Sequence, residues 1–394
     1  MTRRFWGPMQ TFAPETEYLC DLARAWSRGV VGTVPPAVDL DQDRFVRLLA
    51  GQPAMQALVR YLDPSVLPAE ERAQMERAVD ISRRRTTMML LELERVLPGL
   101  AAVDCRPVVL KGASLALTVY DAPEDRWFVD LDLLVEPRHL SAVYGALEQL
   151  GYHFVGQPRI WRYYEKYHFH RVLMSTQGVC IEVHWAVTLP NSVYEFDVEV
   201  LRGSAQEVAL GEVSLLAPQA VDQILHGVLQ SIPAGYGDLR RILDLHRLDA
   251  VLDERQQQAM CERARGYNLS TGLWLQYQLR ETILGPDIPA VVDQLCRPSS
   301  AVVRIFDGLD LAAGCLERNT TQGDGFERLI HWLCVPANTR AREVRRFVWP
   351  SEETHLEVEM RTGKPVTARQ AVQLMMERLL TTGRAFKTLA RASI

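Results

Sequence analysis

Two aspartates separated by one residue are the most informative feature of this sequence. Asp130-Leu131-Asp132 lies in an apolar stretch, and side chains along a strand alternate between its two faces. Both carboxylates then share one face, while Leu131 and Leu133 turn to the other. Carboxylates this close repel each other unless a cation lies between them. Mg²⁺ prefers oxygen ligands, so the pattern indicates a metal site. The alternative is an exposed strand face that carries two acids.

A third carboxylate follows on a later apolar stretch. Residues 181–185 read Ile-Glu-Val-His-Trp, which puts Glu182 and His184 on one face and Trp185 with the apolar residues on the other. A two-metal site needs such a third acid, because one metal activates the attacking oxygen and the other steadies the phosphates and leaving group. We expect the three carboxylates to converge and hold Mg²⁺, with Mn²⁺ as a substitute. Since they repel one another without metal, removing one charge is expected not to lower stability.

A candidate phosphate site lies upstream of the aspartates. Lys111-Gly112-Ala113-Ser114 follows the apolar stretch 107–110, and we expect a glycine turn and then a helix that begins at Ala113. Free backbone N–H groups and the helix dipole make such a turn an anion site. Ser114 is expected to cap the helix, to contact a phosphate, or both. Lys111 adds a positive charge.

Three histidines fall near these residues in the expected sheet. His168 and His170 alternate on one strand, and His184 shares a face with Glu182. They are candidates for contacts to phosphate or to an acceptor. Two alternatives stay open: they ligate a transition metal, which imidazole suits better than it suits Mg²⁺, or they are ordinary surface or hydrogen-bonded histidines.

Three further charged residues are candidates for the same site. Arg126 lies four residues before the first aspartate and is expected either to contact phosphate or to form a structural salt bridge. Arg240 and Asp244 lie on a helix that could cover a nucleotide, with possible contacts to phosphate or acceptor. They share a face at i,i+4, so a simple ion pair between them is the alternative.

The elements that position these residues form three predicted parts. A helical region covers residues 1–100, an α/β core covers 101–217, and a helical region covers 218–394, because the apolar period changes from 3.6 to 2 and back. The helices expected at the two ends are 15–27, 41–61, 68–97 (ended by Pro98-Gly99), 219–230 and 239–252. The core is expected to contain strands at 107–110, 128–135, 152–155, 168–174 and 179–187, with helices at 113–120 and 139–150.

Composition argues against a nucleic-acid-coating protein, a disulfide-rich protein and a membrane protein. The chain has 394 residues and a net charge of -5, which argues against a protein that coats nucleic acid non-specifically. Its seven cysteines are scattered singly, with no CxxC pair, so we expect a cytoplasmic protein without a disulfide framework. No stretch approaches the roughly 18 apolar residues of a membrane span, and the N-terminus lacks the apolar segment of a signal peptide.

The order of these motifs resembles the DNA polymerase β-like nucleotidyltransferase superfamily. The run VLKGASLALTVYDAPEDRWFVDLDLLV, followed by IEVHW, looks like the branch labelled uncharacterised nucleotidyltransferases, over about residues 85–255. That branch is sometimes encoded beside peptide and polysaccharide biosynthesis genes. The chain departs from the superfamily in having Ala113 where a second glycine or a serine is common, which restricts the backbone there.

The resemblance implies an α+β core, with a mixed sheet and flanking helices, between helical terminal regions. It implies transfer of a nucleoside monophosphate from an NTP to a small-molecule, sugar or peptide acceptor, with Mg²⁺ held by Asp130, Asp132 and Glu182. Two alternatives are a transferase that uses a nucleotide-sugar donor and a non-catalytic nucleotide-binding protein. The three intact acids argue against the last of these.

Overall fold

The computed structural model describes residues 12–155, 165–309, 311–317 and 324–348, together with 358–359, 367, 370, 372–373 and 375–376. Its central feature is one seven-stranded sheet with strand order β3-β4-β5-β2-β1-β7-β6. The strands are β1 (Val108–Leu110), β2 (Asp130–Leu134), β3 (Tyr152–Phe154), β4 (His170–Ser175), β5 (Cys180–His184), β6 (Gln206–Leu210) and β7 (Val213–Ala217). The sheet is mixed, because β2–β5 and β1–β7 are parallel whereas the other pairs are antiparallel. The predicted fold class, α+β with a mixed sheet and flanking helices, is confirmed.

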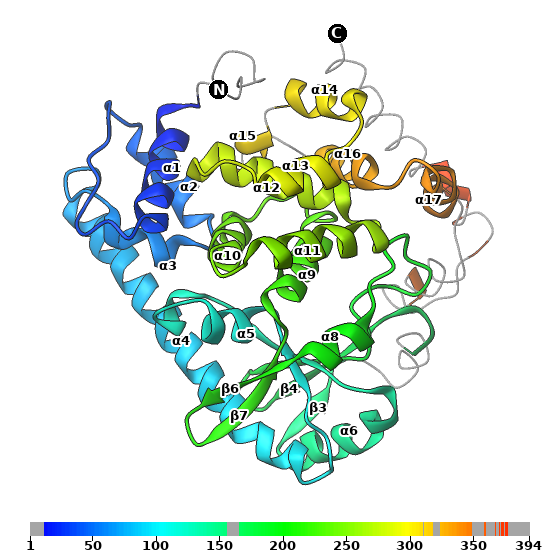
Figure 1. Cartoon of the computed structure of the whole chain (residues 1–394). Coiled ribbons are helices and arrows are strands. Elements are labelled where there is room, and N and C mark those ends of the chain that lie inside the picture. The colour runs from blue at the N-terminus through cyan, green and yellow to red at the C-terminus, as the bar shows by residue number, and fades with distance from the viewer. Residues whose placement is uncertain are drawn as a thin grey trace.

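Helices precede, flank and follow the sheet (Figure 1). Those before and within it are α1 (Pro14–Ser27), α2 (Gln42–Ala50), α3 (Met55–Leu58), α4 (Ala69–Ala101), α5 (Lys111–Thr118), α6 (Leu140–Gln149) and α8 (Val198–Ser204). Those after it are α9 (Ala220–Ser231), α10 (Leu239–Asp249), α11 (Glu254–Gly266), α12 (Ser270–Leu284), α13 (Ala290–Cys296), α14 (Ser300–Gly308), α15 (Leu311–Leu316), α16 (Asp324–Cys334) and α17 (Arg340–Val348).

The alternating pattern of the strands sorts their side chains as expected. Leu131, Leu133, Ile181 and Val183 are fully buried in an apolar cluster that α4 and α6 complete. The opposite face of the sheet carries the acids and turns toward the helical part of the molecule. Leu134 lies on that face and joins the second apolar cluster, so the acids border a packed helical layer rather than open solvent.

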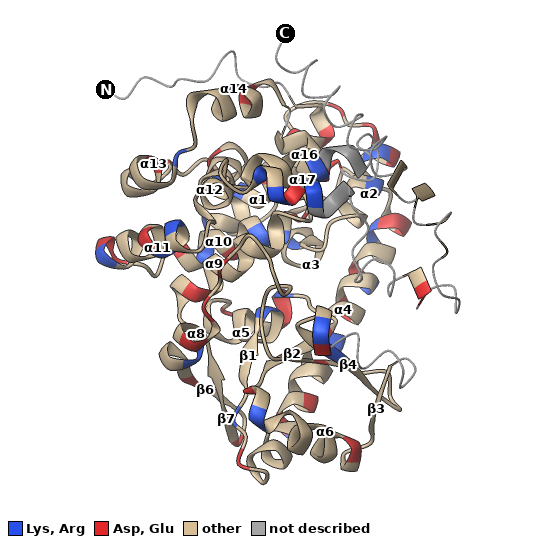
Figure 2. Cartoon of the chain, turned by 90° about the vertical axis from the view of Figure 1, so that its right-hand side faces the viewer, with Lys and Arg blue, Asp and Glu red and all other residues tan. Residues whose placement is uncertain are grey.

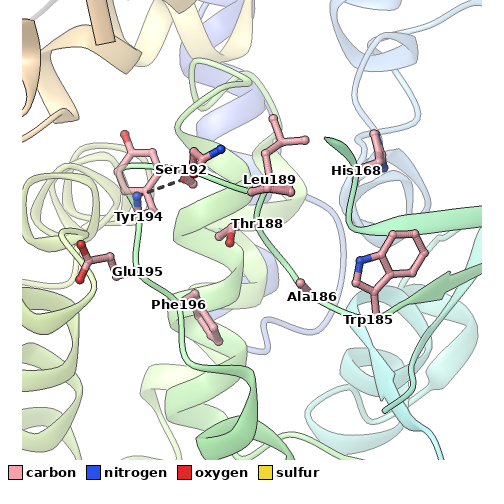
Figure 3. Close-up of a pocket in the computed structure, with 11 residues that line it drawn as sticks. His168, Trp185, Ala186, Thr188, Leu189, Ser192, Tyr194, Glu195 and Phe196 are labelled. Atoms are coloured by element: carbon pink, nitrogen blue, oxygen red, sulfur yellow. Dashed lines mark hydrogen bonds between the residues drawn. The ribbon is translucent and has the colours of Figure 1, made fainter. Parts of the chain in front are cut away.

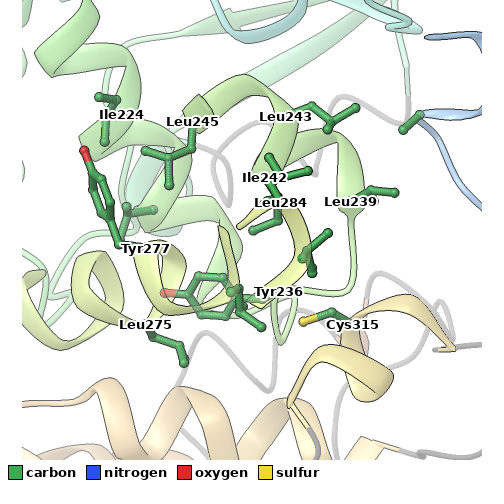
Figure 4. Close-up of a cluster of buried hydrophobic side chains, with 14 of the residues drawn as sticks. Ile224, Tyr236, Leu239, Ile242, Leu243, Leu245, Leu275, Tyr277, Leu284 and Cys315 are labelled. Atoms are coloured by element: carbon green, nitrogen blue, oxygen red, sulfur yellow. The ribbon is translucent and has the colours of Figure 1, made fainter. Parts of the chain in front are cut away.

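Helices from both ends of the chain share that second cluster. Helices α1–α3 pack in it with α9, α10, α12 and α16, and Figure 4 shows its centre. Tyr236, in the turn between α9 and α10, is buried there with a left-handed backbone, and its hydroxyl donates to the Gly272 carbonyl at 2.8 Å. Side chains distant in sequence therefore hold the helical layer above the sheet.

Helix α4 is longer than predicted. It continues through Pro98 to Ala101, although proline removes a backbone donor and was expected to end the helix. Leu97 and Leu100 are buried against the sheet, and this packing offsets the lost hydrogen bond. Basic and acidic residues both occur along the helix (Figure 2). Among the described residues, no helix is both long and apolar enough to cross a membrane.

The β6–β7 hairpin was not predicted. Its strands flank Gly211, whose φ of 54° suits a tight turn, and β7 pairs in parallel with β1 through Leu216 and Val108. The alternating residues of QEVALGEVSLLA carry a signal for this hairpin. It extends the sheet on the side of β1 away from β2.

Candidate active site

Strand register places the acids beside one another. In the parallel β2–β5 pair, Asp132 lies opposite Glu182 and Asp130 lies opposite Cys180. Leu110, the last residue of β1, lies opposite Asp132 on the other side. Three strands thus bring two of the predicted acids and the start of α5 to one place, with Asp130 two residues away on the same strand face.

Lys111 lies between two of the acids. Its ammonium hydrogen-bonds to Asp132 Oδ1, and its Nζ is 3.5 Å from Glu182 Oε2. Burial lowers the pKa of Lys111, but the charges of Asp132 and Glu182 outweigh it, so the pKa is raised. The side chain therefore stays a cation that partly neutralises the site. Its backbone φ is 50°, a left-handed conformation that is uncommon for a residue with a side chain.

Gly112 does not form the predicted turn. It lies inside α5, and the sharp change of direction falls on Lys111 instead. A Cβ on Gly112 would lie 2.3 Å from Phe128 Cβ, so close packing explains the glycine. Ser114 is not the expected helix cap: it is fully buried, and its hydroxyl has no partner among the described residues. Ala113 is likewise buried.

We expect Gly112→Ala to lower the free energy of unfolding by about 1–3 kcal/mol or more, because the new methyl group overlaps Phe128 at its rigid Cβ. Gly145→Ala is the matched control: Gly145 is also helical, and nothing lies within 4 Å of its Cβ position. That control should gain about 0.4–1 kcal/mol. Urea unfolding of both variants measures the difference, and equal effects would contradict the packing argument.

The carboxylates differ in their surroundings. Burial, and then the charge of Asp132, raise the pKa of Asp130 to about 6. Burial raises the pKa of Glu182, but the hydrogen bond from His184 and the charge of Lys111 outweigh it, so this pKa is lowered. Asp130 is therefore the acid whose negative charge is least compensated by the protein itself.

Two of the three predicted histidines contact the acids. His184, which is 1% exposed, has its Nε2 2.8 Å from Asp132 Oδ1 and 3.2 Å from Glu182 Oε2. His170 Nε2 is 3.7 Å from Glu182 Oε1. Burial and the adjacent His184 lower the pKa of His170 to about 3, so this ring is neutral at pH 7. His168 precedes β4 rather than lying on it, and its ring packs edge-on against His170 at 4.4 Å.

A divalent cation fits this arrangement. The carboxylate of Asp132 is buried, and its Oδ2 has no hydrogen-bond partner among the described residues. A buried carboxylate oxygen without a donor is costly unless a cation meets it. Asp130 lies on the same strand face with a raised pKa, and Glu182 lies on the adjacent strand. These three acids would supply the oxygen ligands that Mg²⁺ prefers.

Arg126 forms a structural salt bridge, which was one of its two expected roles. Its Nε and Nη2 donate to the two oxygens of Asp244, both at 2.7 Å, and both side chains are buried. Tyr120 also donates to Asp244 at 2.8 Å. The predicted alternative, an i,i+4 pair between Arg240 and Asp244, is wrong, because Arg126 takes the Asp244 carboxylate.

Arg240 lies at the edge of the site. It pairs with Asp238 at 2.8 Å, donates to the Trp127 carbonyl at 2.8 Å, and stacks over the Trp127 ring at 5.3 Å. The Trp127 carbonyl that it binds lies just before β2, which begins at Asp130. Arg240 therefore places a cation between the sheet and α10.

A pocket of about 360 Å³ adjoins the histidines. It is lined by His168, Trp185 and the segment 186–196, and Figure 3 shows its labelled residues. The prediction that Trp185 belongs to the core is wrong: β5 ends at His184, and the Trp185 side chain is partly exposed in this pocket. The segment 186–196 was not predicted as part of a site, and its sequence carries no motif that marks it.

The chain thus has a mixed sheet with an Asp-x-Asp strand and a third acid on the adjacent parallel strand. The chain belongs to the family described as "Uncharacterised nucleotidyltransferase", whose model matches residues 40–285. This match is wider than the predicted resemblance over about 85–255. General nucleotidyl transfer is the activity that this membership supports.

No curated protein matches the chain. Among solved structures, the antibiotic-resistance factor ANT(2'')-Ia is similar, with 10% sequence identity and a TM-score of 0.33. The similarity covers 46% of this chain and 93% of that one.

Proposed function

We propose that this protein transfers a nucleoside monophosphate from an NTP to a small-molecule, sugar or peptide acceptor, with Mg²⁺ (or Mn²⁺) held by Asp130, Asp132 and Glu182. The observation that carries the proposal is the register of Asp132 beside Glu182, together with the buried Asp132 oxygen that lacks a partner among the described residues. When bound, the cation supplies charge neutralisation at the phosphates and activation of the attacking hydroxyl.

Residues of the chain itself prepare the donor site. Lys111 places an ammonium beside the acids, and the first turn of α5, which starts at Lys111, directs backbone N–H groups that the helix leaves unpaired. These groups suit the phosphates of the donor. Arg126 is buried and holds the segment before β2 against α10 through its bonds to Asp244.

The pocket beside the histidines is the proposed acceptor site. Its volume of about 360 Å³ suits a small molecule or one terminal unit of a sugar or peptide. Trp185 and Phe196 supply aromatic surface, and Thr188 and Ser192 supply hydroxyl groups that can orient a polar acceptor. The seven cysteines are thiols rather than disulfides, and we propose that the enzyme works in the cytoplasm, where thiols persist.

The group transferred is the property to test. Chelator-treated protein is incubated with Mg²⁺, candidate acceptors, and each NTP labelled at either the α- or the γ-phosphate. We expect the α-label to appear on the acceptor, with one pyrophosphate released per transfer and a mass gain of one nucleoside monophosphate. Transfer of the sugar from a nucleotide-sugar would establish the alternative donor. Transfer of the γ-label would refute nucleotidyl transfer.

A further inference from the structure

We propose that His170, Glu182 and His184 form a binding site for a transition-metal ion, with Zn²⁺ as the probe that identifies it. The site shares Glu182 with the proposed Mg²⁺ position and borders it, because His184 Nε2 is also 2.8 Å from Asp132 Oδ1. The proposal concerns metal binding by the free protein, so it does not depend on the proposed nucleotidyl transfer.

The spacing of the donor atoms carries the proposal. One ligand atom from each residue lies within 4.8 Å of the other two. Glu182 lies between the rings, with Oε1 3.7 Å from His170 Nε2 and Oε2 3.2 Å from His184 Nε2. In a tetrahedral zinc site with bonds of about 2.0–2.2 Å, adjacent donor atoms lie about 3.3–3.6 Å apart. Small side-chain movements, together with release to solvent of the Nε2 proton by which His184 bonds to the acids, would therefore complete the coordination.

The donor types favour a borderline metal over Mg²⁺. Two imidazoles and one carboxylate are a frequent ligand set of catalytic zinc, which keeps a further position open, whereas Mg²⁺ prefers oxygen. The rings of His170 and His184 are 4.7 Å apart. The Nδ1 atom of each has no partner among the described residues, so neither ring is fixed by hydrogen bonds at both nitrogens.

The proposed metal site lies next to the pocket. His170 packs against His168, and His168 and Trp185 line the pocket. His170 therefore connects the proposed metal site to the pocket, while His184 Nε2 also contacts Asp132 Oδ1. On the proposed function, the pocket side is the one from which the acceptor arrives.

Calorimetric titration of the chelator-treated full chain with Zn²⁺, and separately with Mg²⁺, tests the site without nucleotide. We expect one Zn²⁺ per chain, bound more tightly than Mg²⁺. His170→Gln should weaken Zn²⁺ binding at least about tenfold and leave Mg²⁺ binding unchanged. Asp130→Asn should do the reverse. Far-UV circular dichroism confirms that each variant is folded.

Two further variants serve as controls. His153→Gln removes an exposed histidine on β3 and should leave Zn²⁺ binding unchanged. Cys180→Ser removes the thiol two residues before Glu182 on the same strand face, and Zn²⁺ binding should persist. The proposal is overturned if wild-type protein binds Zn²⁺ no more tightly than Mg²⁺, if His170→Gln binds Zn²⁺ like wild type, or if Cys180→Ser abolishes binding.

Discussion

Asp132→Asn should lower nucleotidyl transfer by more than about 100-fold, because even the loss of an outer partner of a metal ligand costs 10–100-fold. Asparagine keeps the shape of the side chain and removes the charge that would hold the cation. Asp132 is 1% exposed, so the substitution leaves no room for a water molecule to replace the lost ligand without rearrangement. The measurement is kcat for the proposed transfer at saturating Mg²⁺ and NTP, below the melting temperature of the variant.

The same substitution should also lower stability, contrary to the expectation from sequence. Repulsion between free carboxylates was expected to make the loss of a charge harmless, but Asp132 is paired with Lys111 and His184. The substitution removes the nearest counter-charge of the partly exposed Lys111 and leaves it the charges of Glu182 and Asp130, at a cost of about 1–3 kcal/mol. Asp121→Asn is the control, because Asp121 is an exposed acid whose loss should change neither property. A folded Asp132→Asn protein with full Mg²⁺-dependent activity would refute the mechanism.

Arg126→Met should be the most destabilising of the substitutions considered, with a loss of about 3–5 kcal/mol in the free energy of unfolding. The variant leaves the buried Asp244 carboxylate with Tyr120 as its remaining side-chain partner. The double variant Arg126→Met/Asp244→Leu should be less destabilised than the single one, because no charge is left buried without a counter-charge. Guanidinium unfolding of both variants gives the two values.

Arg138→Met is the matched control for that measurement. Arg138 also pairs with an acid, Glu136, but its side chain is 72% exposed, so its loss should change stability by no more than about 0.5 kcal/mol. If Arg126→Met changed stability as little as Arg138→Met, Arg126 would not be the structural link between the segment before β2 and α10. The other predicted role of Arg126, a contact to phosphate, would then be favoured.

The parts of the fold that sequence predicted well are those set by local periodicity. Leu131 and Leu133 are buried and the acids of β2 turn to the other face, because alternation along a strand needs no knowledge of its neighbours. The partners of Lys111 and Arg126 depend on strand register and on contacts across 21 and 118 positions, respectively. Predictions from local spacing were wrong where a distant residue made the contact instead: Asp244 pairs with Arg126 rather than with Arg240 on its own helix.

The Lys111 ammonium couples the binding of metal to the binding of nucleotide. The ammonium already lies against Asp132 and Glu182, so a divalent ion that binds these acids must displace a singly charged group. The released ammonium becomes available to a triphosphate. Binding of the two ligands is coupled reciprocally: if the nucleotide raises the affinity for the metal by some factor, the metal raises the affinity for the nucleotide by the same factor. We therefore expect weak Mg²⁺ binding to the free protein and cooperative loading of metal and nucleotide, with the lysine as the exchanging counter-ion.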